Sequence, residues 1–380
     1  MSEREVGADE SGVVLSAAKS ALRWPAEWEP HRATWLSWPH NVETWPGRLA
    51  SVEDAFCEIV RAILPGERVE INVSDGAMAS RVGARLLGAG IPDLDRVRFH
   101  EVPTNDAWIR DHGGIFVECR DAASASASAE EVTTAAARGA VVDFGFDAWG
   151  GKYPPWDLDA AVGARMAEIA GMPRLGESRV LEAGSIDGDG EGTILTTESC
   201  LLNPNRHQPG QDRSREGLER MLAESLGARS VLWLGEGIEG DDTDGHVDDL
   251  SRFVSPGRVV TVVEEDPQGA DFEVLAENRR RLEGMRDAEG RALEVVPLPV
   301  PSAIEGPEGR LPASYANFYF CNQALLLPVF GVEQDSEAIE RLSSVVSDRP
   351  VIPIPSQNLV LGLGSVHCLT QQEPDFLVGD

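Results

Sequence analysis

Helical and strand-like patterns alternate along almost the whole chain. Apolar residues recur at helical spacing in residues 51–64, and the following segment 68–73, RVEINV, has the composition of a strand. A second helical segment, 78–90, ends at glycines, as helices often do. This alternation predicts an α/β architecture. We expect further strands at 97–102, 114–119 and 140–146, and helix–strand pairs at 212–226 with 230–234, 271–285 with 293–298, and 335–346 with 350–354.

Three segments depart from this pattern. Residues 1–23 have no clear periodicity and are interpreted as a flexible N-terminal tail. The Trp-rich segment that follows contains too many prolines for one regular element, so its rings are expected to pack against the body. Residues 121–138 are low-complexity Ala, Ser and Glu between two expected strands, which indicates a surface insertion. The sequence therefore predicts one domain over residues 24–376.

The chain is strongly acidic, with 33 basic and 64 acidic residues and a formal charge of −31. Such a surface disfavours nucleic acid, because binding a polyanion depends on clustered Lys and Arg. It attracts cationic small molecules, although an acidic surface that merely keeps the protein in solution is an equally good explanation.

Membrane and disulfide signals are missing from the sequence. No run of eighteen apolar residues is present, and the acidic N-terminus lacks a signal-peptide pattern, so we expect a cytoplasmic protein without a membrane partner. The five cysteines are scattered without paired spacing, which argues against disulfides and a structural zinc site. The sequence leaves a homo-oligomer open.

A cysteine follows a glycine-rich run near the C-terminus, in LGLGSVHC at 361–368. Gly362 and Gly364 permit close approaches that a side chain would block, so the loop could present Cys368 to a small molecule. A buried cysteine that packs as a small hydrophobic residue is the commoner alternative.

Polar residues that could carry chemistry cluster between the expected strands. His246 and Asp248, two apart, point to the same face of an extended segment and could move protons and hold a cation. Asp111 and Trp108, in NDAWIRDHGG, would serve as a carboxylate and a flat wall, and Glu182 follows an apolar stretch. A turn-capping pair is the alternative for His246 and Asp248. Taken singly, Asp111, Trp108 and Glu182 are more often a local ion pair, a core ring and a solvated carboxylate.

One acidic segment is similar in sequence to a calcium-binding loop. Asp187, Asp189 and Glu191, with Glu198 downstream, nearly reproduce an EF-hand loop. That motif needs flanking helices, whereas GTILTT is strand-like, so a tight turn between strands is the better interpretation.

In combination, these stretches resemble the agmatine deiminase family, which includes bacterial peptidyl-arginine deiminases, within the guanidine-modifying superfamily. The resemblance extends over residues 24–374. The matching stretches, in order, are WPAEWEPHRATWLSWP, NDAWIRDHGG, AWGGKYPPWD, LEAGSIDGDGEGTILTTESCLLNPNR, DDTDGHVDDLSRF, SYANFYFCNQALLLPVFG and GSVHCLTQQEP.

The resemblance implies a pentein fold, a pseudo-fivefold β/α propeller of ββαβ units around a central active site. It implies that Cys368 is the nucleophile, that Asp111 and Asp248 hold the guanidinium, and that Glu182 and His246 form the acid/base pair. A covalent thiouronium intermediate, with no metal or organic cofactor, would lead from agmatine to N-carbamoylputrescine and ammonia. Trp108 is a candidate for substrate contact.

The chain departs from the family pattern in places that leave the implied catalytic groups intact. It has GLGSVHC where the family has GGGNIHC, EAG where EGG is usual, and RDHGG where RDTGP is usual. Peptidyl-arginine or free arginine is therefore an alternative substrate to agmatine. Transfer of the amidino group to an acceptor, and a non-catalytic protein that binds guanidines or polyamines, are further alternatives.

Overall fold

The computed structural model describes residues 22–120, 138–307 and 309–376. Most of the predicted tail and insertion, at 1–21 and 121–137, lies outside these residues. Leu22–Arg23 form strand β1, which pairs with β5, so regular structure begins two residues before the predicted domain start. Among the described residues, no helix combines the length and apolar character needed to cross a membrane.

The described strands form five sheets of three or four strands and one short hairpin. The first sheet has the order β19 (Gln371–Pro374), β2 (His31–Ser37), β3 (Arg68–Val73) and β4 (Val97–Glu101), and the second has β1, β5 (Ile115–Cys119), β6 (Gly139–Gly145) and β7 (Arg174–Val180). The third contains β10 (Ser230–Leu234), β9 (Thr193–Thr197) and β8 (Ile186–Gly188), and the fourth β11 (Ser251–Ser255), β12 (Arg258–Val263) and β13 (Glu294–Pro299). The fifth contains β16 (Tyr319–Cys321), β17 (Ala324–Val329) and β18 (Val351–Pro355), and the hairpin pairs β14 (Glu305–Gly306) with β15 (Gly309–Arg310).

Each of the five sheets repeats one pairing scheme. An antiparallel pair is followed by a parallel pair, as in β11–β12 and β12–β13 or β16–β17 and β17–β18. A parallel pair needs a crossover, and each crossover here carries a helix. The crossover helices are α2 (Leu49–Ile63), α3 (Gly76–Gly88), α7 (Val162–Ala170), α9 (Arg215–Leu226), α10 (Phe272–Gly284) and α11 (Gln334–Val345). The predicted ββαβ unit is therefore present in chain order in four of the sheets, whereas in the first sheet β19, from the far end of the chain, takes the place of the first strand.

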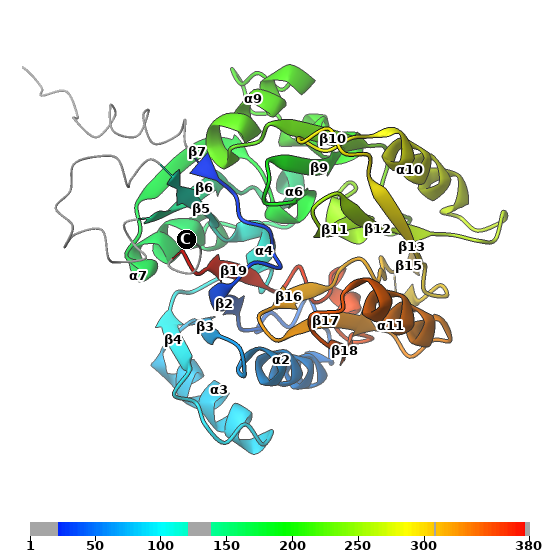
Figure 1. The fold of residues 1–380 in the computed structure, drawn as a ribbon. Helices are drawn as coiled ribbons and strands as arrows, with labels where there is room; N and C mark the ends of the chain where they lie inside the picture. Colours follow the sequence, from blue (N-terminus) through cyan, green and yellow to red (C-terminus); the bar gives the residue numbers. More distant parts are fainter. Residues whose placement is uncertain (1–21, 121–137, 308, 377–380) are drawn as a thin grey trace, which may run out of the picture.

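The sheets follow one another around the molecule in chain order, from β2–β4 through β5–β7, β9–β10 and β11–β13 to β16–β18 (Figure 1). The last strand, β19, returns to pair with β2 in the first sheet. This pairing joins the chain's two ends, so the arrangement agrees with the predicted pentein fold.

Five of the six crossover helices form where the apolar spacing predicted them, whereas α7 was not predicted. In α2 the buried residues include Val52, Phe56, Ile59 and Ile63, which recur every three or four positions and pack as one face against the sheets. Helices α7 and α9 end at glycines in the left-handed conformation, with φ of 68° at Gly171 and 74° at Gly227. The remaining helices are short and lie in loops: α4 (Ile109–His112), α6 (Ala148–Gly151), α8 (Glu198–Leu201), η2 (Asp159–Ala161), η3 (Ala183–Ser185), η4 (Pro204–Arg206), η5 (Val247–Asp249) and η6 (Val360–Gly362).

Candidate active site

Short loop helices from different units carry the predicted site residues. Asp111 lies on α4, Glu182 immediately precedes η3, and His246 and Asp248 flank and occupy η5. Helices α4 and η5 both contact η3. Cys368 lies in the loop between η6 and β19. The chain therefore brings together residues up to 257 positions apart, counted from Asp111 to Cys368.

The Cys368 thiol lies beside one of the two predicted carboxylates. Its Sγ is 3.8 Å from Asp248 Oδ2 and accepts a hydrogen bond of 3.2 Å from Asn317 Nδ2. A Cβ added at Gly364 would lie 2.6 Å from the ring of Trp108 and 3.2 Å from Cys368 Cβ. Glycine is required there because no side chain fits between the ring and the cysteine. The loop therefore makes a close approach to Trp108. Presentation of Cys368 to a small molecule stays a prediction.

Both carboxylates face the same imidazole. His246 Nδ1 is 3.8 Å from Asp111 Oδ1 and 4.0 Å from Asp248 Oδ1. The backbone of Gly184 lies against all three groups, since a Cβ there would be 2.7 Å from Asp111 Oδ1 and from His246 Nδ1 and 3.1 Å from Asp248 Oδ2. Its N–H donates to Asp111 Oδ1 at 3.2 Å. This glycine closes one side of the site, and it leaves room for the three polar groups because it has no side chain.

Several polar atoms in the site have no hydrogen-bond partner among the residues that the structure describes. They are both ring nitrogens of His246, Oδ1 of Asp248 and Oε2 of Glu182. The other oxygen of Glu182, Oε1, accepts from Arg206 Nε at 2.9 Å. Buried polar atoms are nearly always paired, so this concentration of unpaired atoms marks a place where another molecule supplies the partners.

Burial sets the protonation states. It lowers the pKa of His246 to about 3, which makes the imidazole neutral at physiological pH. Burial, together with the negative charges of Asp248, Asp249 and Asp111, raises the pKa of the Cys368 thiol well above its usual value. Without a bound cation, the nucleophile is therefore a neutral thiol.

The two carboxylates have opposite shifts. Burial raises the pKa of Asp111 well above its usual value, and the nearby Asp248 and Glu182 raise it further. Burial also opposes ionisation of Asp248, but hydrogen bonding to His367 and its charge lower that pKa. Burial raises the pKa of Glu182 despite its bond to Arg206. The site thus has one firmly ionised carboxylate and one that gains from a cationic partner.

Trp108 packs as a core ring beside the cysteine loop. It is buried, and its ring centroid is 5.3 Å from that of Trp45 with a 43° tilt. The same apolar cluster contains Cys368. Direct contact of Trp108 with a substrate stays a prediction.

Sequence reasoning assigned no role to several residues that hold the site. Trp149 donates its indole N–H to Asp111 Oδ2 at 3.0 Å, and it has a left-handed backbone with φ of 58°. Asn317 contacts Cys368, Arg206 holds Glu182, and His367 donates from Nδ1 to Asp248 Oδ2 at 2.6 Å. All four lie in the stretches that carry the family resemblance, which was the available signal.

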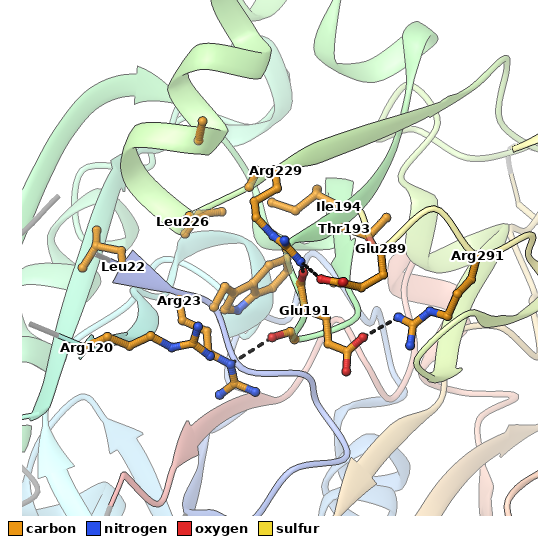
Figure 2. A pocket seen from close by; sticks show the side chains of 17 residues that line it. Leu22, Arg23, Arg120, Glu191, Thr193, Ile194, Leu226, Arg229, Glu289 and Arg291 are labelled. Atoms are coloured by element: carbon orange, nitrogen blue, oxygen red, sulfur yellow. Dashed lines mark hydrogen bonds and ion pairs between the residues drawn. The ribbon is translucent and has the colours of Figure 1, made fainter. Parts of the chain in front are cut away.

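The acidic loop at 187–191 is a turn between strands β8 and β9, as the sequence favoured. Its side chains are committed elsewhere: Asp187 accepts from Arg252, Asp189 from Thr193, and Glu191 pairs with Arg291. Figure 2 shows Glu191 and Arg291 at a surface pocket of about 1130 Å³, where Arg229 also pairs with Glu289. The calcium alternative is wrong for these residues, and none of the predicted site residues lines this pocket.

Comparison with known proteins agrees with the geometry. The family model of Porphyromonas-type peptidyl-arginine deiminase matches residues 23–374. The chain belongs to this family. It is 37% identical to the agmatine deiminase of Ectopseudomonas mendocina over 92% of this chain and 95% of that protein. The agmatine deiminase of Medicago truncatula is also 37% identical, over 92% of this chain and 96% of its own length.

Solved structures extend this result to three dimensions. The agmatine deiminase of Enterococcus faecalis, solved while catalysing its reaction, superposes with a TM-score of 0.81. The two share 31% identity, and the match covers 98% of this chain and 100% of the other. This member of the deiminase family therefore has its relatives' fold over essentially its full length.

Proposed function

We propose that the protein hydrolyses the guanidinium group of agmatine to N-carbamoylputrescine and ammonia through a covalent intermediate on Cys368. This proposal rests on one observation: Cys368, Asp111, Asp248 and His246 converge at a place where several buried polar atoms have no hydrogen-bond partner among the described residues. Curated relatives named agmatine deiminase support the substrate.

The carboxylates suit a planar cation. A guanidinium presents N–H groups in a fixed plane, and Asp111 and Asp248 accept such bonds in charge-assisted form. Because both face the imidazole of His246, a bound guanidinium would have its reacting carbon held near the proton-transfer group. Binding also compensates the negative charges that raise the pKa of Cys368, so the substrate itself favours the reactive thiolate.

The chemical steps then balance around one proton carrier. Cys368 loses its proton to a neutral His246, and the thiolate attacks the guanidinium carbon. The tetrahedral adduct expels ammonia, which takes a proton from His246, and leaves an S-alkylthiouronium. His246 next accepts a proton from water, and hydroxide adds to the same carbon. Collapse expels the Cys368 thiolate, which takes this proton back from His246, while the hydroxyl of the adduct loses its proton to solvent to give the ureido product. Glu182 orients His246 and stabilises its charged form.

A small substrate fits the burial of this site better than a protein surface does. Cys368 is 6% exposed and Asp111 4%, and the other three residues of the proposed chemistry are less exposed still. A small cation such as agmatine can be enclosed by residues this buried, whereas a peptide needs an opening for its backbone. We further propose a cytoplasmic enzyme whose partner is a small cationic guanidine and not a nucleic acid; the homo-oligomer stays a prediction.

The test is an assay of ureido product and ammonia with agmatine, arginine and an arginine-terminated peptide. We expect the highest kcat/KM for agmatine, and a loss of at least about 10⁴-fold in Cys368→Ala. Preference for the peptide would replace agmatine by the peptidyl-arginine alternative. No turnover of any substrate by the folded protein would refute the enzyme. A haloacetamidine should label Cys368 in the native protein and leave Cys368→Ala unlabelled.

A further inference from the structure

A second thiol lies beside the acid/base pair, and the mechanism does not use it. Cys200 is on α8 and is completely buried. One ligand atom each from Glu182, Cys200 and His246 lie within 4.8 Å of one another. A carboxylate, a thiol and an imidazole converge here from three separate segments of the chain.

Two of these residues have free ligand atoms. Glu182 Oε2 and both ring nitrogens of His246 are buried, and within residues 22–120, 138–307 and 309–376 they have no hydrogen-bond partner. The opposite oxygen of Glu182 is occupied by Arg206, so Oε2 is the atom left for a cation. Unpaired atoms at fully buried positions call for an explanation, and a ligand supplies one.

The donor set selects the class of ligand. A thiolate, an imidazole and a carboxylate suit Zn²⁺, which accepts all three donor types and takes three protein ligands when one position stays open. The soft sulfur disfavours Mg²⁺ and Ca²⁺, which prefer oxygen. In a tetrahedral zinc site the ligand atoms are roughly 3.3–3.8 Å apart, so modest side-chain rotation from the observed spacing of up to 4.8 Å would complete the site.

We propose that Glu182, Cys200 and His246 form a binding site for one zinc-like divalent cation, and that its occupation inhibits the enzyme. The metal displaces the Cys200 proton to solvent, and the resulting thiolate and the Glu182 carboxylate balance the charge of the ion. The ion occupies the ring nitrogen and the carboxylate oxygen that proton transfer needs. Inhibition rests on the proposed deimination, whereas metal binding does not.

The binding test is a Co²⁺ titration of the purified full-length protein, followed by absorption. Co²⁺ reports a thiolate ligand through a sulfur-to-metal charge-transfer band. We expect one Co²⁺ per chain with this band in the wild type, in Cys368→Ala and in the matched control Cys57→Ala, which changes another buried cysteine. Cys200→Ala should lose the band, with Cys200→Ser as a second variant of nearly the original shape.

Zinc affinity and inhibition complete the test. Competition with a chelating indicator should show at least about 100-fold weaker Zn²⁺ binding in Cys200→Ala, because even outer-shell changes cost 10- to 100-fold. Zn²⁺ should inhibit the wild type reversibly, with each variant compared with its own metal-free rate. The site is refuted if the wild type shows no charge-transfer band, or if Cys368→Ala loses the band while Cys200→Ala keeps it. If the charge-transfer band is present but the protein deiminates no substrate, the metal site is supported and the proposed deiminase function is refuted.

Discussion

Two adjoining regions of the buried interior differ in how far their charged and polar groups are paired. The paired cluster, Glu27, Arg110, Asp187, Arg252 and His367, satisfies its charges internally. The reaction chamber, defined as Asp111, Glu182, His246 and Cys368, contains buried atoms of Glu182 and His246 that have no hydrogen-bond partner among the described residues. Asp248 belongs to both regions, because one of its oxygens accepts from His367 and the other has no partner.

The paired cluster is organised around Glu27. Arg252 Nη2 is 3.0 Å from one of its oxygens, and Arg110 Nη2 and His367 Nε2 are 3.1 Å and 2.9 Å from the other. Burial alone would raise the pKa of Glu27, but these three partners hold it well below its usual value. Both ring nitrogens of His367 lie within hydrogen-bond distance of a carboxylate, with Nε2 2.9 Å from Glu27 and Nδ1 2.6 Å from Asp248.

The comparison shows how the protein keeps a set of buried charges in place for catalysis. The hydrogen bond from His367 to Oδ2 fixes the Asp248 carboxylate, so Oδ1 has a defined position before substrate binds. The chamber keeps its hydrogen-bonding capacity for the guanidinium. Changes in the paired cluster should therefore affect mainly stability, and changes in the chamber mainly activity.

Glu27→Gln should have the largest effect on stability. It leaves Arg110 and Arg252 buried without their shared carboxylate, and breaking a buried ion pair costs about 3–5 kcal/mol of unfolding free energy. Urea unfolding at neutral pH measures this loss. The control is Glu58→Gln, which removes an exposed pair with Arg61 and should cost less than about 1 kcal/mol. Equal losses in both variants would contradict the structural role of the cluster.

Asp111→Asn should reverse this pattern. Removing one of the two carboxylates that hold the guanidinium should lower kcat/KM for agmatine by about 10³-fold. The unfolding free energy should stay constant or rise, because burial already opposes ionisation of this carboxyl. Steady-state kinetics and urea unfolding of the same preparation separate the two outcomes. Activity within tenfold of the wild type would remove Asp111 from substrate binding.

His367→Asn tests the connection between the regions. The change removes the bond that fixes Asp248 Oδ2, and displacement of a catalytic group by about 1 Å costs about 10²-fold in rate. We expect kcat to fall more than the unfolding free energy can explain, with the variant still folded at the assay temperature. If the variant loses stability but keeps its kcat, His367 supports the fold and does not position Asp248.

The sequence predicted the fold well because its signals are local. The segment 68–73 became β3 without a change of boundary, and the helix expected at 51–64 is α2 at 49–63. Apolar spacing is a property of neighbouring residues, and it defines such elements directly. The five-unit arrangement came from family resemblance, since the pairing of β19 with β2 joins segments more than 330 residues apart.

Sequence reasoning singled out the titratable residues of the candidate site and missed the residues that support them. Asp111, Glu182, His246, Asp248 and Cys368 have side chains whose chemistry suggests a role, and the chain places them together. Arg206 and Asn317 are ordinary in sequence and gain meaning from the atom each one contacts. The cluster of Glu182 and His246 with Cys200 likewise depends on tertiary proximity. Such pairings depend on the folded geometry, which no spacing along the chain encodes.

The smallest expected effect is on the pH dependence of Cys368 alkylation. Burial and the charges of Asp248, Asp249 and Asp111 raise the pKa of this thiol, and the thiolate is the reactive form. The rate of alkylation by iodoacetamide should therefore keep rising with pH beyond the range in which an unfolded cysteine reaches its plateau. Mass spectrometry of the Cys368 peptide measures the rate, and the urea-unfolded protein is the control.

In Asp111→Asn, one of the opposing charges is gone, so alkylation at a given pH should become a few-fold faster. The contradicting outcome is an alkylation rate that reaches its plateau at lower pH in the native protein than in the unfolded control. The reaction chamber would then favour the thiolate without substrate, and the charge of the substrate would not be needed to activate the nucleophile.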